Sequence, residues 1–380
     1  MRSNRREVMA LLMAGAAAPA LSSCTGGPDP AAAWRAPGAG ESDLRRFALA
    51  HAILAPNPHN RQPWLVEMVG DDEVRFFVDV ERLLPATDPF DRQITIGCGA
   101  FLELFDLAVR QRGKTAEIAL FPDGEPQPRL DQRPIAHIRI TDAAAERDPL
   151  FDQIVRRRTN REPFGERVPD AALLARIAAL GAIGAAQSLT IESVQGGALR
   201  DELRRLAWDA FEREFRTPAA HMETVNLIRV GRKEIAEHRD GIAIEGGMVE
   251  FAKMLGMVNR STLADIDNSQ TRDGLMEWRP LALEAPAYVW ITTPDNTRAT
   301  QIAAGRAYAR LNLAATAEGL AMHPWSQALQ EYPEMAALHA QAERLLDAPG
   351  EARVQMLARV GYGPEVKAAP RRGLDAHIRA

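Results

Sequence analysis

Residues 55–64 read Ala-Pro-Asn-Pro-His-Asn-Arg-Gln-Pro-Trp, and the interpretation of the whole chain starts from this loop. Its first two prolines end the helix predicted before it, because proline lacks an N–H and restricts the residue that precedes it. Amide and imidazole groups are therefore held in a stiff segment directly before a predicted strand. Such a loop can present donors and acceptors to a heteroaromatic ligand. The same composition also suits a capped turn that satisfies only its own backbone.

A second polar stretch, residues 156–164, reads Arg-Arg-Arg-Thr-Asn-Arg-Glu-Pro-Phe. Guanidinium groups combined with a hydroxyl suit a phosphate monoester, because charge-assisted hydrogen bonds can surround a dianion. The alternative is a solvated, arginine-rich helix end. That alternative stays open at this point, since only four of the 46 basic residues are lysines and arginine is used throughout the chain.

Together these two stretches resemble motifs of the nitroreductase family of flavin enzymes. Residues 60–64 resemble its glutamine-proline-tryptophan loop, and residues 157–161 resemble its motif of arginine, serine or threonine, and a basic residue. In ordinary members the basic motif comes first. The reversed order, with residues 88–92 and 97–100 between the motifs, is similar to the Acg-type branch, whose single chain resembles a fused nitroreductase dimer. Over residues 42–380 the resemblance implies an α+β nitroreductase-like fold with mixed sheets flanked by helices.

The resemblance implies one FMN, bound between the two halves of the chain. One flavin per chain is expected because residues 181–184 of the second half, Gly-Ala-Ile-Gly, lack the polar ring contacts. A closing basic motif at the C-terminus would also reach the phosphate, through Arg371 or Arg372. The residues that the resemblance assigns to FMN are Arg157, Thr159, Arg161, Arg371 and Arg372 around the phosphate, Pro56, Asn57, His59, Asn60 and Gln62 around the ring, and Trp325 and Ser326 in a turn after the second core helix.

Apolar periodicity divides the remainder into a first half, 42–148, and a second half, 149–380. The halves echo each other as helix, loop, strand, core helix and strand, which we interpret as a candidate duplication. The segment 217–279 has weak strand signals and many methionines, and is either a lid or a region with methionine as core filler. Predicted helices are 42–54, 94–112, 150–158, 168–180, 200–215 and 300–320, and predicted strands are 64–69, 74–80, 116–121, 135–140, 188–194, 287–293 and 354–360.

The N-terminus has the three-part order of an export signal. Arg5-Arg6 precedes an apolar run, and small residues precede Cys24, as in a twin-arginine signal peptide over 1–23 that ends in a lipobox. We expect export by the twin-arginine machinery, a lipid on Cys24, a flexible tether over 24–41 and a periplasmic lipoprotein whose membrane contact is the anchor alone. The alternative is an uncleaved amphipathic N-terminus.

Composition excludes several classes of function. With 51 acidic residues, a net charge of −5 and no basic stripe, a nucleic-acid partner is not expected. The eight histidines show no metal-ligand spacing. Residues 97–99, Gly-Cys-Gly, lack a third glycine and lie in an apolar helix, so they predict a close helix contact with a buried Cys98.

The expected function is that of an FMN-dependent oxidoreductase. The family analogy implies ping-pong electron transfer from a small-molecule donor to a nitroaromatic or quinone-like acceptor, with no catalytic side chain and no metal. The alternative is an FMN-binding or flavin-sequestering lipoprotein without efficient NAD(P)H turnover. The chain is expected as a monomer with an internal pseudo-dimer or as a homodimer.

Overall fold

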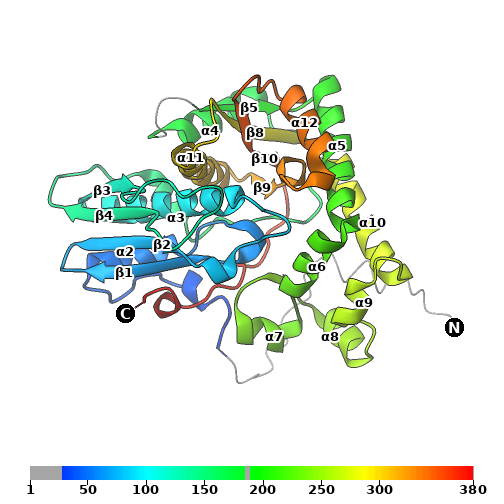
Figure 1. Ribbon diagram of the computed structural model, residues 1–380, viewed down its shortest axis with the longest axis horizontal. Coiled ribbons are helices and arrows are strands. Elements are labelled where there is room, and N and C mark those ends of the chain that lie inside the picture. The colour runs from blue at the N-terminus through cyan, green and yellow to red at the C-terminus, as the bar shows by residue number, and fades with distance from the viewer. Residues whose placement is uncertain (1–27, 185–188, 380) are drawn as a thin grey trace.

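Two four-stranded sheets, each packed on a long buried helix, form the body of an α+β fold (Figure 1). The computed structural model describes residues 28–184 and 189–379. The predicted signal peptide and Cys24 lie outside these residues. Part of the predicted tether is packed, because Ala32–Trp34 forms a 3-10 turn in which the Trp34 indole is buried and its Nε1 donates to the Ala369 carbonyl at 2.8 Å.

The first half forms a sheet in the order β1-β2-β4-β3, with every pairing antiparallel. Helix α2 begins after Asp43 instead of the predicted Ser42, because the Asp43 carboxylate accepts the backbone N–H of Arg45 at 2.8 Å. The elements are α2 (Leu44–Ala52), β1 (Trp64–Val69), β2 (Glu73–Val78), α3 (Arg92–Gln111), β3 (Thr115–Leu120) and β4 (Ala136–Thr141).

The second half repeats this topology, with the order β5-β8-β10-β9 and a core helix between the second and third strands. The helix predicted over 150–158 is wrong, because only Pro149–Gln153 is helical and forms a 3-10 segment. After it the chain turns toward strand β9 (Ala321–Pro324), where Asn160 N donates to Met322 O at 3.0 Å. Strand β9 was not predicted. The elements are α4 (Ala171–Ala182), β5 (Thr190–Val194), β8 (Ala287–Thr293), α11 (Arg298–Ala317), β9 (Ala321–Pro324), α12 (Ala336–Leu345) and β10 (Arg353–Gly361).

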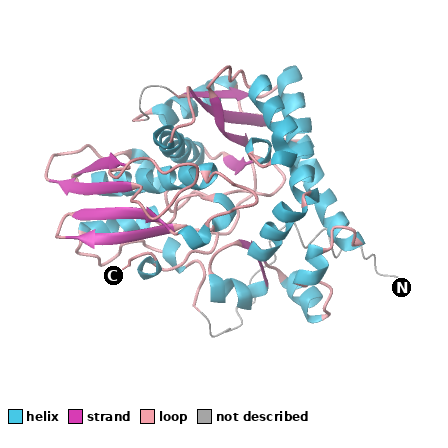
Figure 2. Ribbon diagram, viewed as in Figure 1, coloured by secondary structure: helices cyan, strands magenta, loops and turns pink. Residues whose placement is uncertain are grey.

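A largely helical insertion joins β5 to β8, at the position where residues 70–72 join β1 to β2 (Figure 2). Its segment 217–279 contains five helices and one short parallel pair, β6-β7, so the weak strand signals were mostly misleading. The elements are α5 (Gly197–Arg216), α6 (Pro218–Leu227), β6 (Ile228–Val230), α7 (Gly231–His238), β7 (Ile242–Ile244), α8 (Gly247–Met254), α9 (Arg260–Ala264) and α10 (Ser269–Leu283).

The two core helices cross in close contact at Gly99 of α3 and Gly305 of α11. A Cβ on Gly305 would lie 1.9 Å from the Ile96 carbonyl oxygen, and one on Gly99 would lie 2.2 Å from that of Ile302. Glycine is therefore required for the helices to approach this closely. The predicted close contact is confirmed, and Cys98 beside it is fully buried.

The C-terminal residues return to the first half and pack on β1. Val66 N donates to His377 O at 2.8 Å, Arg379 N donates to Val66 O at 3.0 Å, and Val66 forms a parallel bridge with Ile378. The parallel component of the predicted mixed sheets comes from this bridge and from β6-β7. The end of the sequence-defined second half thus contacts the first sheet.

Within the described residues, none of the helices combines the length and the apolar character needed to cross a membrane.

Candidate functional site

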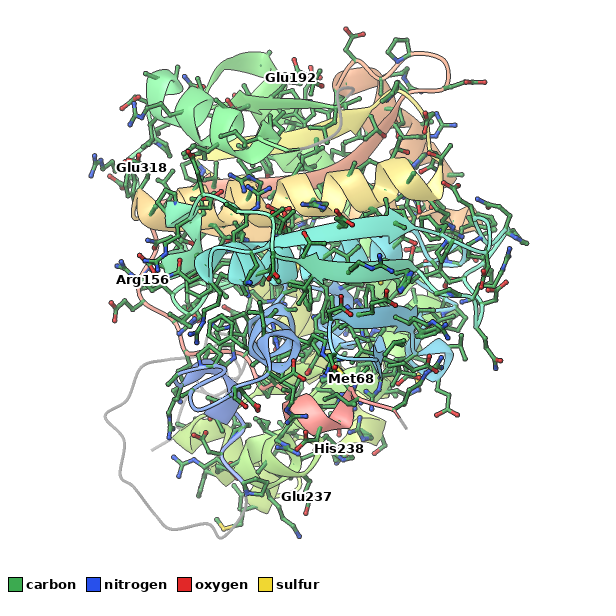
Figure 3. All side chains as sticks on the ribbon, turned by 90° about the vertical axis from the view of Figure 1, so that its left-hand side faces the viewer. Met68, Arg156, Glu192, Glu237, His238 and Glu318 are labelled. Carbon is green, nitrogen blue, oxygen red and sulfur yellow. The ribbon has the colours of Figure 1, made fainter. Side chains whose placement is uncertain are left out.

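The loop of residues 53–62, the arginine-rich stretch and the C-terminal arginines meet at one place between the halves. Arg157 Nη2 donates to the Leu54 carbonyl at 3.2 Å. Arg371 donates from Nε to the Ile53 carbonyl at 2.9 Å and from Nη2 to the Leu54 and Ala55 carbonyls at 3.2 and 3.1 Å. Figure 3 labels the neighbouring Arg156 at the left-hand edge of the molecule, below Glu318, which directly follows α11. The geometry brings together the segments that the family resemblance pairs.

The backbone of the loop is strained in three residues. His59, Asn60 and Gln62 have φ values of 47°, 51° and 51°, a region that costs a non-glycine residue about 1 kcal/mol or more. Two side-chain contacts hold this conformation: Asn57 Oδ1 accepts the backbone N–H of Gln62 at 2.7 Å, and Asn60 Oδ1 accepts from Arg371 Nη1 at 2.6 Å. Strain held in place by surrounding contacts is typical of a functional loop.

Several of the predicted ring contacts are occupied by the protein itself. Gln62 is fully buried, its Nε2 donates to the Arg239 carbonyl at 2.9 Å, and its Oε1 accepts the N–H of Arg372 at 2.9 Å. Asn60 Nδ2 donates to the Pro370 carbonyl at 3.0 Å. These side chains therefore connect the loop to the insertion and the C-terminal tail. Pro56 is buried as well.

His59 differs from the other polar side chains of this loop, because its Nδ1 is buried without a hydrogen-bond partner. Burial, followed by the charges of Arg161 and Arg61, lowers the pKa of His59 to about 4. The ring is therefore neutral near pH 7. The influence of Arg161 also places His59 of the first half near the arginine-rich stretch of the second.

Arg157, Arg158, Arg161 and Arg371 form what we call the arginine cluster, which has no carboxylate partner among the described residues. Arg157 is 2% exposed, and its Nε and Nη1 are buried without any hydrogen-bond partner. Burial lowers the pKa of Arg157 to about 10, and burial followed by the charges of Arg157 and Arg158 lowers the pKa of Arg371 well below its usual value. Buried charges in proteins are ordinarily paired, so the cluster indicates an anionic ligand.

Arg161 and Thr159 are less buried than Arg157, since Arg161 is exposed and Thr159 is half-buried. Arg161 is exposed, yet desolvation by surrounding protein lowers its pKa. Neither the Arg161 guanidinium nor the Thr159 hydroxyl has a hydrogen-bond partner in the part of the chain that the structure describes, so both are free to bind a ligand.

The structure distinguishes the two C-terminal arginines that the sequence left open. Arg371 lies with the arginine cluster, since Arg157 and Arg158 influence its pKa. Arg372 instead lies among Arg82, Asp79 and Asp240, and its Nη2 donates to the Gln62 carbonyl at 2.7 Å. Arg371 therefore adds buried positive charge to the arginine cluster while its own N–H groups hold the backbone of residues 53–55, the Asn60 side chain and the Pro370 carbonyl, and Arg372 holds the loop at Gln62.

Trp325 and Ser326, predicted in the turn after the core helix, have their polar groups satisfied within the protein. Trp325 is 1% exposed, its Nε1 donates to the Ala207 carbonyl at 3.0 Å, and its backbone N–H donates to the Leu357 carbonyl at 2.8 Å. Ser326 Oγ donates to the same carbonyl at 3.0 Å. We expect neither side chain to donate to a ligand.

Two aromatic residues at the site were missed from the sequence. The Trp34 ring lies against three guanidiniums, with centroid distances of 5.6 Å to Arg157, 4.7 Å to Arg158 and 5.1 Å to Arg371. Tyr308 of α11 lies near Arg157 and Arg161, and burial raises its pKa to about 12. The sequence did contain a signal for Tyr308. Its hydroxyl lies on the buried face of a predicted core helix, and Asn312 follows four residues later on the same face.

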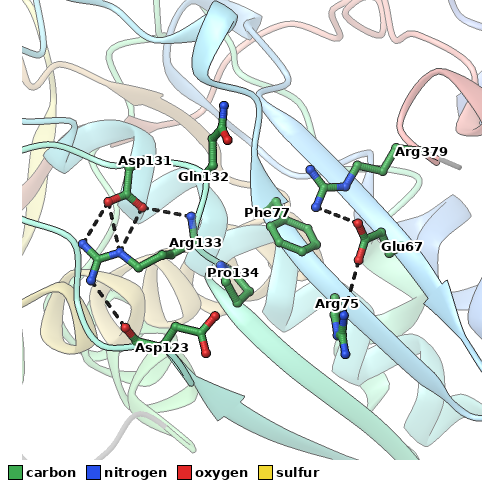
Figure 4. Close-up of a pocket in the computed structure, with 9 residues that line it drawn as sticks. All are labelled: Glu67, Arg75, Phe77, Asp123, Asp131, Gln132, Arg133, Pro134 and Arg379. Atoms are coloured by element: carbon green, nitrogen blue, oxygen red, sulfur yellow. Dashed lines mark hydrogen bonds and ion pairs between the residues drawn. The ribbon is translucent and has the colours of Figure 1, made fainter.

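The hollow shown in Figure 4 differs from this site because each of its arginines is paired with a carboxylate. Arg379 binds Glu67 at 2.7 Å, and Arg133 binds Asp131 at 2.9 Å. The arginine cluster, by contrast, brings several guanidiniums together without a carboxylate partner among the described residues. No group of three or more metal-ligating side chains converges within those residues.

No family model matches the chain. It is 29% identical over 354 residues to the candidate NAD(P)H nitroreductase Acg of Mycobacterium tuberculosis, covering 89% of this chain and 97% of that protein. A second candidate NAD(P)H nitroreductase of the same organism is 26% identical over 329 residues, covering 85% of this chain and 86% of that protein. Among solved structures, the FMN-dependent nitroreductase NfnB from Mycobacterium smegmatis in complex with NADPH is 21% identical, with a TM-score of 0.38 over 60% of this chain and 96% of that chain. Over most of its length the chain is thus similar to two proteins that carry the name nitroreductase.

Proposed function

We propose that this protein is an FMN-dependent oxidoreductase that passes electrons from a small-molecule donor to a nitroaromatic or quinone-like acceptor by a ping-pong cycle. The observation that carries this proposal is the arginine cluster, in which Nε and Nη1 of Arg157 are buried without a hydrogen-bond partner. The names of the full-length relatives support the class of reaction.

The residues present fit the phosphate of FMN. A phosphate monoester carries close to two negative charges near neutral pH and accepts several hydrogen bonds. Arg157, Arg161 and the Thr159 hydroxyl supply donors without protein partners, and Arg371 supplies a further buried positive charge. A dianion would compensate the charge that the described carboxylates leave unmatched. An apolar or cationic ligand would not.

Each residue then has a task in binding and orientation. Arg157, Arg161 and Thr159 would hold the phosphate, while Arg371 fixes the carbonyls of residues 53–55 beside it. Asn57, Asn60 and Gln62 hold the strained loop that presents the neutral His59. FMN, when bound, supplies the redox chemistry, so no side chain is required as a proton donor or acceptor.

The insertion contacts this loop directly and is positioned to control access. Gly241 N donates to the Asn60 carbonyl at 3.1 Å, and the Asp240 carboxylate binds Arg82 at 2.8 Å and Arg229 at 2.9 Å. These contacts support the proposal that 217–279 serves as a lid.

We also propose export through the twin-arginine machinery and anchoring by a lipid on Cys24, which would leave the protein periplasmic. The order of charge, apolar run and small residues in 1–24 supports this. Cys24→Ser should abolish incorporation of labelled palmitate, and replacing Arg5 and Arg6 by lysine should retain the protein in the cytoplasm. Unchanged labelling and unchanged fractionation would contradict the proposal.

Flavin retention tests the function. Purified wild-type protein should carry FMN and be reduced by a small-molecule donor, then reoxidised by a nitroaromatic or quinone. The double variant Arg157→Met/Arg161→Met should weaken FMN binding by about a hundredfold or more, because it removes two charge-assisted contacts. Riboflavin, which lacks the phosphate, should bind both proteins with similar affinity.

Arg156→Met is the matched control, since this neighbouring arginine is exposed and its removal should leave FMN affinity within about threefold. A wild-type protein that does not take up FMN would contradict the flavin assignment. Undiminished retention in the double variant would contradict the placement of the phosphate.

A further inference from the structure

His323 of β9 is held by a buried arginine on the neighbouring strand. Residues Arg359 and His323 are paired in the register of β10 and β9, and Arg359 Nε donates to His323 Nδ1 at 3.0 Å. Arg359 is 1% exposed. Its guanidinium is fixed in turn by the Glu162 carbonyl at 2.9 Å and by the Phe164 ring, whose centroid lies 4.1 Å away.

This contact determines where the imidazole carries its proton. A guanidinium donates hydrogen bonds and cannot accept one, so His323 Nδ1 must be unprotonated. The ring is then neutral, with its proton on Nε2. Burial, and then the charges of Arg359 and Arg161, keeps the pKa of His323 well below its usual value, which agrees with the neutral form.

The Nε2–H of His323 has no acceptor in the part of the chain that the structure describes. Although the whole residue is only 7% exposed, Nε2 is not among the buried polar atoms that are sealed from solvent. The backbone N–H of Asn160, which precedes Arg161, donates to the carbonyl of Met322, the neighbour of His323, at 3.0 Å. The charge of Arg161 also contributes to lowering the pKa values of both His323 and His59. His323 therefore lies beside the arginine-rich stretch, with a single fixed donor that the protein leaves unused.

We propose that His323 donates a hydrogen bond from Nε2 to the FMN held by the arginine cluster, and that Arg359 is the positioning residue that fixes this tautomer. The inference rests on the proposed function. It adds a contact from the second sheet to those that the loop and the arginines provide.

Nitrogen NMR of the full chain labelled with ¹⁵N-histidine tests the tautomer, with the His323 signals identified by their loss in His323→Gln. We expect an unprotonated Nδ1 and a protonated Nε2 that do not titrate across the neutral range, and a shift of the Nε2 signal on adding FMN. His51 provides the internal reference for the opposite tautomer, because its Nδ1 lies 2.8 Å from the Phe47 carbonyl oxygen. A titrating His323, a proton on Nδ1 or signals insensitive to FMN would overturn the proposal.

Two substitutions at His323 then test the donor itself. Glutamine places an amide N–H near the position of Nε2, whereas leucine removes the donor. We expect the dissociation constant of FMN to rise about tenfold in His323→Leu and less than about threefold in His323→Gln. Equal affinities in wild type and His323→Leu would overturn the inference.

Arg359→Met tests the positioning role of Arg359 through the tautomer of His323, which would not change if Arg359 only stabilised the fold. It should release Nδ1 and give a mixture of His323 tautomers in the NMR spectrum, and an unchanged Nε2–H tautomer would contradict the role. If this variant fails to fold, the two His323 variants still decide the matter. Failure of this inference is distinguishable from failure of the proposed function, because the latter would leave even the wild-type chain without FMN.

Discussion

Two groups of arginines in this molecule differ in how their charge is compensated. At the crossing of the core helices, Arg306 binds Glu103 at 2.8 Å and Asp106 at 2.9 Å, and Arg310 binds Glu103 at 3.0 Å and Asp148 at 2.9 Å. The pKa values of Arg306 and Arg310 are raised by these carboxylates, which outweigh burial. In the arginine cluster burial prevails and the pKa values are lowered. The crossing is electrostatically complete by itself, whereas the cluster has no carboxylate of its own among the described residues.

The comparison separates residues that hold the fold from residues that bind. Removing one member of a buried pair leaves its partner charged and uncompensated, which is strongly destabilising. Removing a buried charge that has no partner relieves a desolvation penalty. The two groups should therefore respond with opposite signs to the same substitution.

The largest effect is expected where the crossing is tightest. Gly305→Ala places a Cβ 1.9 Å from the backbone oxygen of Ile96, so α3 and α11 must separate. We expect a loss of about 4 kcal/mol or more in the free energy of unfolding, or no soluble protein. Urea unfolding followed by circular dichroism measures it. Gly196→Ala is the control, since nothing lies within 4 Å of its Cβ position, and equal stability of the two variants would contradict the crossing.

The second-largest effect is expected when a substitution removes one charge from the helix crossing. Arg310→Met leaves Asp148 without this partner and Glu103 with Arg306 alone. We expect the free energy of unfolding to fall by about 3 kcal/mol, the range found when a buried pair loses one member. Adding FMN should not restore the difference. A variant as stable as wild type would show that these pairs contribute nothing to the fold.

The third effect is the opposite response in the cluster. Arg157→Met in FMN-free protein should leave the free energy of unfolding unchanged or raise it by about 1 kcal/mol, because an uncompensated buried charge is removed. With excess FMN the order should reverse, since ligand binding stabilises only the protein that binds it, by about 2.7 kcal/mol at a hundredfold excess over the dissociation constant. Thermal unfolding with and without FMN measures both. If Arg157→Met lowered the free energy of unfolding of the FMN-free protein, the arginine cluster would respond like the helix crossing, and this would contradict the comparison.

Much of the framework could be predicted from the sequence because its periodicity is strong. Both core helices were expected, and Gly99 was expected at a close helix contact. The loop before Trp64 and the arginine-rich stretch were identified from local residue types. Their adjacency followed only from the family resemblance, since contacts such as Arg157 with Leu54 join distant segments and have no local signal.

What the sequence missed depended on tertiary contacts. The helix predicted over 150–158 gave way to a short 3-10 turn, because Asn160 pairs with β9. Trp34 was placed in a flexible tether, although its ring packs against the arginine cluster. Gln62 was expected at the flavin, but its amide is satisfied by Arg239 and Arg372. In each case a long-range partner decided the outcome, and propensity or motif could not reveal that partner.

The smallest effect concerns a buried group that titrates where the tail covers β1. His377 is 1% exposed, and burial, followed by the charge of Arg372, lowers its pKa to about 3. Because the unfolded chain takes up a proton near pH 6.5 and the folded chain does not, stability is lost as the pH falls below that value. Between pH 6.5 and 5.5 His377 should contribute a loss of about 1 kcal/mol.

Other histidines with lowered pKa values add to the same trend, so the measurement is the difference between wild type and His377→Gln in urea unfolding at the two pH values. The wild-type protein is expected to be the more stable at pH 6.5, where its Nδ1 hydrogen bond to the Trp64 carbonyl, at 3.0 Å, is intact and the unfolded state is only half protonated. Its advantage should shrink by about 1 kcal/mol at pH 5.5, because the glutamine variant has no proton to take up at this position. A difference in stability that does not change with pH would contradict this prediction. It would mean that His377 takes up a proton as easily in the folded protein as in the unfolded chain.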